Sequence, residues 1–245
     1  MIVYGRNPVR EALRGRRKVE RVWATAGAGR EEWLTEIAVE QVDAAEIEAL
    51  CESPEHQGIC AATEPYPYAD PGRLLAKDDA LVVCLDEIQD PHNLGAVCRV
   101  AESAGLAGVL IPTRRSAQVT PAACKASAGA VEHLAVARAP NIANWLADAK
   151  AAGAWVYGAA ASAEAAAPYE RPDYRGRVVL VLGSEGRGLR PRVAAACDTL
   201  VALPQRGRVG SLNVSTAAAA LVYGILHFRT AGVDEKAQWD HTGPK

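Results

Sequence analysis

The sequence predicts an α/β protein in which a small α/β domain precedes a larger domain built on a parallel sheet. From about residue 80 onward, near-continuous apolar runs alternate with helical patterns, which is typical of a parallel sheet covered on both faces. Before residue 64, helical patterns and shorter strand-like runs are mixed, as in a small α/β layer. The segment between these parts, residues 65–79, is rich in proline and interrupts all periodicity.

The first domain, residues 1–64, is expected to hold three helices and two strands. The helical patterns cover residues 7–15, 30–40 and 44–52, and the strand-like runs are VERVWAT and GICAAT. Charge is uneven here, because residues 6–21 carry seven basic side chains against Glu11 and Glu20, whereas residues 31–64 are strongly acidic. The basic arm suits an RNA phosphate backbone, and an ordinary solvated helix face explains the same charges equally well.

The second domain, residues 80–232, repeats strand and helix in turn. The expected strands are ALVVCLD, AGVLIP, LAVAR, AWVYGAA, RVVLVLG and TLVALP, and the expected helices cover residues 93–105, 121–128, 142–152, 189–197 and 214–229. Ligands of such sheets bind at the carboxyl ends of the strands. Residues 65–79 are expected to form a stiff, extended linker, and residues 233–245 a polar tail.

Composition narrows the class of protein. The 245 residues are 49% hydrophobic with a net charge of −2, so a disordered chain and a polycation that binds nucleic acid by charge alone are both excluded. The six cysteines form no C-x-x-C pair and have no zinc spacing, which indicates free thiols in a reducing compartment and no bound metal. Without a secretory signal or a membrane-spanning run, the protein is expected to be cytoplasmic.

Three segments that follow strands of the second domain are dense in Gly, Asn, Ser and charge. They span residues 86–105, 182–191 and 203–215. The glycines of the second segment stand at 183, 186 and 188, the reverse of the G-x-G-x-x-G spacing, and no G-x-x-x-x-G-K-[ST] is present. The sequence therefore argues against a dinucleotide or P-loop site and leaves a glycine-rich turn that a ligand is able to approach closely.

These segments resemble the three motifs of the SpoU/TrmH family of RNA ribose 2′-O-methyltransferases. They read N-L-G-A-V-C-R (93–99), L-G-S-E-G-R-G-L (182–189) and P-Q-R-G-R-V-G-S-L-N-V-S (204–215), and YGRNPVREAL (4–13) resembles the start of members with an N-terminal RNA-binding domain similar to small ribosomal proteins. The resemblance implies a SPOUT-type trefoil-knotted methyltransferase domain, S-adenosylmethionine as methyl donor, and a homodimer that completes the active site. Two departures are Gln205, where methionine is more usual, and a third loop made unusually basic by Arg206 and Arg208.

The resemblance also implies roles for particular residues. The catalytic positions it marks are Asn93, Arg99, Glu185, Ser211 and Asn213. The cofactor-binding positions it marks are Gly183, Leu203 and Leu212. The cations expected to contact RNA are Arg6, Arg10, Arg14, Arg16, Arg17, Lys18 and Arg21 in the first domain and Arg187, Arg206 and Arg208 around the cleft, with Arg190 as a further candidate there.

Most of the catalytic positions also have an ordinary structural explanation. Asn93 suits a helix N-cap, Arg99 a surface ion pair, and Glu185 a favourable charge at the start of a helix. Ser211 and Asn213 suit caps of the last long helix. With the resemblance, we favour a role of all five in the active site.

The expected function is transfer of a methyl group from S-adenosylmethionine to a ribose 2′-OH, with a guanosine in large-subunit ribosomal RNA as the favoured target. Transfer RNA is the alternative substrate. A non-catalytic RNA-binding protein of the same fold and a nucleotide-dependent oxidoreductase are the rival classes, the latter disfavoured by the glycine spacing.

Overall fold

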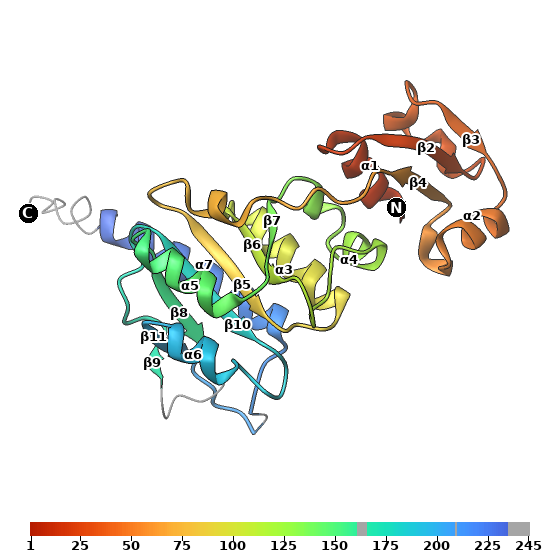
Figure 1. Ribbon diagram of the computed structural model, residues 1–245. Coiled ribbons are helices and arrows are strands. Elements are labelled where there is room, and N and C mark those ends of the chain that lie inside the picture. The colour runs from red at the N-terminus through yellow and green to blue at the C-terminus, as the bar shows by residue number, and fades with distance from the viewer. Residues whose placement is uncertain (161–165, 209, 235–245) are drawn as a thin grey trace, which may run out of the picture.

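The computed structural model describes residues 1–160, 166–208 and 210–234 and holds two sheets (Figure 1). The four-stranded sheet has the order β1-β4-β2-β3, and the seven-stranded sheet has the order β7-β6-β5-β10-β8-β11-β9. Every strand pair of the larger sheet is parallel. The prediction of a parallel-sheet domain preceded by a small α/β domain is confirmed.

The first domain packs two helices and several short 3₁₀ turns around its sheet. Its elements are β1 (Ile2–Tyr4), α1 (Arg6–Arg14), β2 (Val19–Ala24), η1 (Ala28–Arg30), η2 (Glu32–Leu34), β3 (Val39–Gln41), α2 (Ala44–Cys51), η3 (Pro54–His56) and β4 (Ile59–Thr63). The helix expected over residues 30–40 is wrong. Residues 32–34 form the 3₁₀ turn η2, and Val39 begins β3, where it pairs with Val22 of β2.

The second domain follows η4 (Pro71–Leu75) and alternates strand and helix. Its elements are β5 (Leu81–Asp86), α3 (Pro91–Ser103), β6 (Gly108–Pro112), α4 (Pro121–Ala126), η5 (Ala130–Glu132), β7 (Val136–Ala139), α5 (Ile142–Ala151), β8 (Trp155–Ala159), β9 (Ala167–Pro168), β10 (Val178–Gly183), α6 (Pro191–Ala196), β11 (Thr199–Ala202) and α7 (Val214–Asp234). The two-residue strand β9 was not expected. From residue 235 on, the polar tail lies outside the described residues.

The large sheet is buried on both faces, as its continuous apolar strands require. In β5, Val82 and Cys84 belong to the core with α5 and α6, whereas Val83 and Leu85 belong to the core with α3 and α7. Successive side chains of a strand point to opposite faces, so each strand needs apolar residues at every position. The trefoil knot stays a prediction.

The segment expected as a linker packs onto the second domain. The hydroxyl of Tyr66 lies within hydrogen-bonding distance of the carbonyls of Val131 and Leu134 and donates to them. Leu74 and Leu75 of η4 are buried against the sheet. One hydrophobic core runs through both domains. The two domains are therefore joined by a packed interface rather than by a free spacer.

At the centre of that interface lies Arg17, which was expected to contact RNA. Its guanidinium donates to both carboxylate oxygens of Glu132, from Nε at 2.9 Å and from Nη2 at 2.5 Å, and to the carbonyl of Glu64 at 3.2 Å. The side chains of Arg17 and Glu132 are 1% and 2% exposed. The expectation for Arg17 is corrected, because a buried and fully paired guanidinium has no access to a phosphate.

Candidate active site

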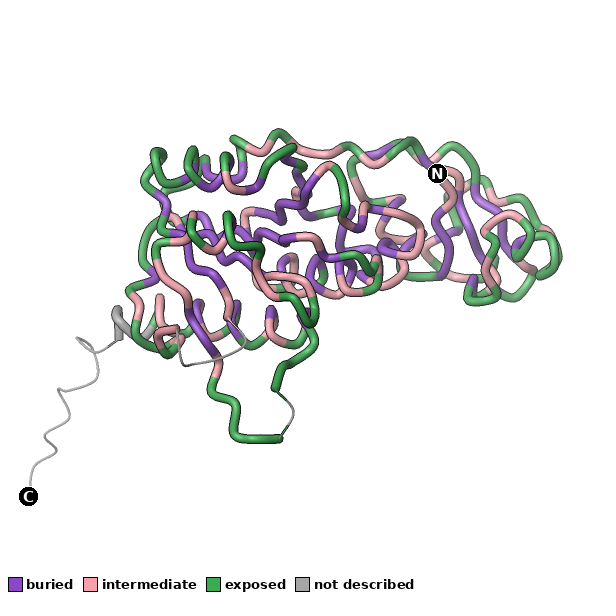
Figure 2. Tube along the Cα trace, turned by 60° about the horizontal axis from the view of Figure 1, so that its bottom comes forward, coloured by how far each residue is buried: buried purple, intermediate pink, exposed green. Residues whose placement is uncertain are grey.

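Three loops meet at the carboxyl-end edge of the large sheet. They follow Asp86 of β5, Gly183 of β10 and Ala202 of β11, and they lead into α3, α6 and α7. Figure 2 shows the loop after β11 standing out from the body of the domain, with residues 204–208 exposed. The sequence predicted this edge as the ligand site, and all three motifs lie on it.

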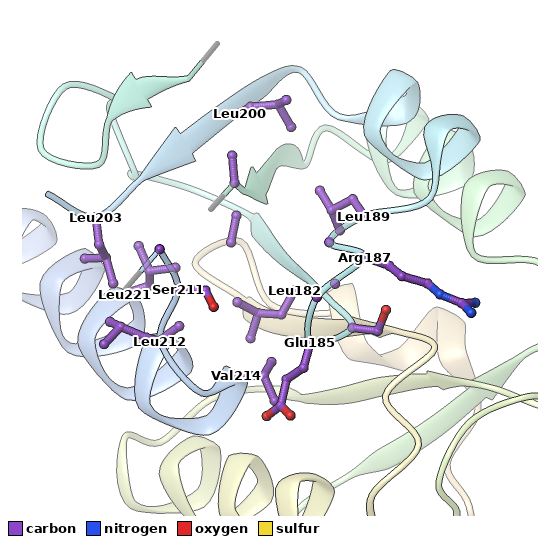
Figure 3. Close-up of a pocket in the computed structure, with 18 of the residues that line it drawn as sticks. Leu182, Glu185, Arg187, Leu189, Leu200, Leu203, Ser211, Leu212, Val214 and Leu221 are labelled. Carbon is purple, nitrogen blue, oxygen red and sulfur yellow. The ribbon is translucent and has the colours of Figure 1, made fainter. Parts of the chain in front are cut away.

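A cavity of about 490 Å³ lies between the two later loops and α7 (Figure 3). The leucines that line it are Leu182, Leu189, Leu200, Leu203, Leu212 and Leu221. In Figure 3, Leu203, Leu212 and Leu221 gather on one side, whereas Arg187 extends away from them. Ser211, Gly183 and Gly188 also line the cavity. The volume and the apolar walls of the cavity are those of a site for a small organic ligand.

Gly183 shapes this cavity by leaving room for the loop that follows it. The loop folds back so that Gly188 N donates to the carbonyl of Ser184 at 2.9 Å. A Cβ atom at position 183 would lie 2.1 Å from the carbonyl carbon of Gly188, which no side chain tolerates. Gly186 and Gly188 have φ of 78° and 68°, which favour glycine.

Three of the five catalytic candidates form one hydrogen-bonded cluster at the mouth of the cavity. The Nδ2 atoms of Asn93 and Asn213 both donate to Glu185 Oε1, at 3.0 and 2.7 Å, and Asn213 Nδ2 is 3.0 Å from Asn93 Oδ1. Asn213 Oδ1 in turn accepts from the backbone N and the Oγ of Ser215. The cluster joins one residue from each motif, so it fixes the three loops relative to one another.

The helix-cap explanation is wrong for Asn93 and correct for Asn213. Asp90 caps α3 by accepting from His92 N at 2.8 Å, and Asn93 lies in the first turn, so the N-cap explanation for Asn93 is wrong. Asn213 does cap α7, because its side chain accepts from Ser215 N while it also contacts Glu185. Ser215 is a residue that the sequence reasoning missed.

Arg99 is exposed on α3 and stands apart from the cluster. It follows Asn93 by six positions, a rotation of about 240° around a helix with 3.6 residues per turn, so the two side chains leave from different faces. Within residues 1–160, 166–208 and 210–234, Arg99 makes no ion pair or hydrogen bond, so the surface-ion-pair explanation finds no partner there.

Two family models cover this chain. The model described as the SpoU rRNA methylase family matches residues 80–223. The chain belongs to the SpoU rRNA methylase family. The second model, described as RNA 2′-O ribose methyltransferase substrate binding, matches residues 2–69 of this SpoU protein.

Curated relatives agree with this membership, and a solved structure shares the fold. The chain is 37% identical to the uncharacterized tRNA/rRNA methyltransferase slr0955 of Synechocystis over 95% of its own length and 63% of that protein's. It is 36% identical to YacO of Bacillus subtilis, whose name describes it as a putative TrmH family tRNA/rRNA methyltransferase, over 93% of this chain and 95% of YacO. Its fold matches that of the SpoU methyltransferase AviRb of Streptomyces viridochromogenes, which was solved in complex with AdoMet. The TM-score is 0.78 and the identity 24%, and the match covers 94% of this chain and 91% of AviRb.

An ion pair with a buried carboxylate, which the sequence reasoning missed, holds the glycine-rich loop of this SpoU domain to β5. The carboxylate of Asp86 is buried and accepts from Arg190 N at 2.9 Å and from its Nε at 2.7 Å. These bonds raise the pKa of Arg190. Glu87, whose φ is 60°, accepts a hydrogen bond on Oε1 from Arg190 Nη1 at 3.0 Å. Arg190 is thus held to the loop, and because its side chain is 43% exposed, its contact with RNA stays a prediction.

The basic arm of the first domain is largely paired with acids. Salt bridges join Arg6 to Glu31, Arg10 and Arg14 to Glu11, and Arg21 to Glu40. Arg16 donates to the carbonyl of His133, and Lys18 is exposed. Exposed pairs are worth about 0–1 kcal/mol, so a phosphate is able to compete for these cations. Except for Arg17, their contact with RNA stays a prediction.

Burial lowers the reactivity of the cysteine thiols. All six are free, and burial is the main cause that raises the pKa of each thiol, which disfavours the nucleophilic thiolate. Over the described part of the chain, no group of His, Cys, Asp and Glu is arranged to hold a metal ion. No helix there combines the length and apolar character needed to cross a membrane.

Proposed function

We propose that the protein transfers a methyl group from S-adenosylmethionine to the 2′-OH of a ribose in structured RNA. The observation that carries this proposal is the cluster of Asn93, Glu185 and Asn213 at the mouth of an apolar cavity. Two comparisons support the proposal. The family model that matches the first domain is described as RNA 2′-O ribose methyltransferase substrate binding, and AviRb, which has the same fold, was solved in complex with AdoMet.

The cavity suits S-adenosylmethionine by its chemistry. Leu203 and Leu212 offer apolar faces for the adenine ring, and the loop backbone around Gly183 offers amides and carbonyls to its polar edge. When bound, S-adenosylmethionine supplies the methyl group. Among the described residues that line the cavity, Glu185 is the only carboxylate, and two amides already engage it, so these residues offer no acidic ligand of the kind that a dinucleotide ribose takes.

Gly183→Ala is expected to lower the affinity for S-adenosylmethionine by on the order of tenfold or more. The added Cβ collides with the backbone of Gly188, so the loop wall of the cavity must move. Isothermal titration calorimetry measures the effect. Gly27→Ala is the matched control, because that position has φ −73° and no atom within 4 Å of its Cβ. Equal affinities of the two variants would contradict this placement of the cofactor.

The residues of the chain divide the remaining work between them. Glu185 holds the amides of Asn93 and Asn213, which are then positioned to orient the ribose. We assign Arg99 to the adjacent phosphate and to the negative charge that develops on the 2′-oxygen. A guanidinium keeps its proton at neutral pH, so Arg99 stabilises this charge rather than acting as a general base.

A homodimer accounts for the different faces of α3 on which Arg99 and Asn93 lie. Arg99 leaves α3 on a different face from Asn93, and Tyr223 of α7 is a large exposed apolar residue on the helix that packs against α3. We assign this surface to a second copy, whose Arg99 completes the neighbouring site. Co-expression of Arg99→Ala and Asn213→Ala chains tests it: mixed dimers regain activity if Arg99 acts across the interface and stay inactive if it acts within its own chain.

Large-subunit ribosomal RNA with a guanosine target is the preferred substrate, and transfer RNA is the alternative. The relatives' names include both RNA classes. Incubation with radiolabelled S-adenosylmethionine and unmodified transcripts of each class tests the proposal. Label on ribosomal RNA alone supports the preferred substrate, label on transfer RNA alone supports the alternative, and label on neither favours a non-catalytic RNA-binding protein.

A further inference from the structure

Two exposed arginines, Arg114 and Arg115, follow β6 at the same edge of the sheet as the catalytic cluster. β6 pairs with β5, where Leu110 lies opposite Cys84, so the carboxyl ends of the two strands are adjacent. The loop after β5 leads directly into α3 and Asn93. The arginine pair therefore stands beside the loop that precedes the catalytic helix.

Hydrogen bonds fix the loop that carries these arginines. Gln89 Nε2 donates to the carbonyl of Arg115 at 2.5 Å. The carbonyl of Ile88 accepts from Ser116 Oγ at 3.1 Å and from Ala117 N at 2.7 Å. Arg115 has φ 55°, so the chain turns sharply at this point. The position of the pair relative to the active site is thus set by the backbone.

The charges of this pair are not neutralised within the described parts of the chain. There, neither guanidinium makes an ion pair or a hydrogen bond. The acidic residues of the adjoining loop are engaged elsewhere, since Glu87 pairs with Arg190 and Asp90 caps α3. In contrast to the paired cations of the first domain, Arg114 and Arg115 are open to an anion from solution.

The same segment continues toward the first domain. Thr120 caps α4, which lies between the large sheet and the first domain in Figure 1. Lys125 of α4 donates to the carbonyl of Glu55 at 2.8 Å, and Val119 N donates to the hydroxyl of Tyr68. Residues 114–125 therefore run from the active-site edge of the sheet to the first domain.

We propose that Arg114 and Arg115 bind phosphates of the RNA strand between the part held by the first domain and the nucleotide in the active site. This inference rests on the proposed function. Guanidinium groups match phosphate oxygens with paired hydrogen bonds, and an unpaired cation releases counterions when it meets a phosphate. The pair thereby contributes RNA affinity and helps to place the target ribose.

The test compares the wild type with the Arg114→Gln/Arg115→Gln double variant. Binding to a large-subunit ribosomal RNA transcript is measured at several salt concentrations. Loss of two phosphate contacts is expected to make the slope of log affinity against log salt shallower by about 1.4 to 1.8, and to weaken binding by on the order of tenfold. Affinity for S-adenosylmethionine and the thermal melting temperature are expected to stay at wild-type values.

Two further double variants separate the proposal from a general charge effect. Arg73→Gln/Arg171→Gln removes the same charge at the opposite edge, where Arg171 lies in a hollow with Trp155 at the start of β8; it is expected to bind as the wild type does. Arg114→Lys/Arg115→Lys is expected to restore the salt slope. The proposal is overturned if the Gln pair near the site keeps wild-type affinity and slope, or if the distant pair loses as much.

The failure of this inference is distinguishable from failure of the proposed function. Phosphate contacts determine the salt slope whether or not the transcript is methylated. A wild type that binds RNA but methylates none contradicts the proposed function, and the slope still reports on the two arginines. A wild type that methylates RNA while the Gln variant binds normally contradicts the inference alone.

Discussion

Arg99→Ala is expected to lower the rate of methyl transfer by about 10²- to 10³-fold, because it removes the charge assigned to the developing 2′-oxyanion. Affinity for S-adenosylmethionine is expected to stay near the wild-type value, since Arg99 does not line the cavity. Single-turnover methylation of RNA measures the rate, and calorimetry measures the donor affinity.

Two comparisons make this expectation specific. Arg99→Lys keeps the charge but loses the planar fork, so it is expected to retain part of the rate. Arg192→Ala removes another exposed helical arginine, on α6, and is expected to leave the rate unchanged. A loss of donor affinity equal to the loss of rate in Arg99→Ala would contradict the division of work between cavity and arginine.

Glu132→Ala is expected to lower the free energy of unfolding by about 3–5 kcal/mol, because it leaves the buried guanidinium of Arg17 without its carboxylate. This is a large part of the about 5–15 kcal/mol that stabilises a typical domain. Urea denaturation followed by circular dichroism measures the change. Since the pair joins the two domains, loss of the interface is expected to precede global unfolding.

An exposed ion pair of the same chain provides the control. Glu40→Ala breaks the pair with Arg21, in which the side chains are 44% and 61% exposed, and is expected to cost at most about 1 kcal/mol. The Arg17→Met/Glu132→Leu variant removes both buried charges and is expected to regain much of the lost stability. A cost of Glu132→Ala no larger than that of Glu40→Ala would show that the pair is not an interdomain anchor.

Strong periodicity made most of the second domain predictable. The strands around Val83 and Leu180 are apolar at every position, and this pattern belongs to a sheet covered on both faces. The first domain was harder, because the residues around Trp33 contain both helical and strand spacing. Residue 33 lies in a 3₁₀ turn, and tertiary pairing of Val39 decided the outcome.

The candidate site was predicted in part for the same reasons. The motifs identified Asn93, Glu185 and Asn213, but their shared hydrogen bonds depend on a sheet order that local patterns do not contain. Arg17 belongs to a run of cations that looks solvated in the sequence. Its partner Glu132 stands 115 positions away, and only packing of the two domains brings them together.

The position of the transferred methyl group distinguishes a ribose 2′-O-methyltransferase from a base methyltransferase and from a non-catalytic RNA-binding protein. The wild type is incubated with RNA and S-adenosylmethionine that carries a deuterated methyl group, and the RNA is digested to nucleosides for mass spectrometry. We expect the label on the ribose of a 2′-O-methylated nucleoside, with guanosine preferred. Label on a base, or no label in any RNA that the protein binds, would contradict this expectation.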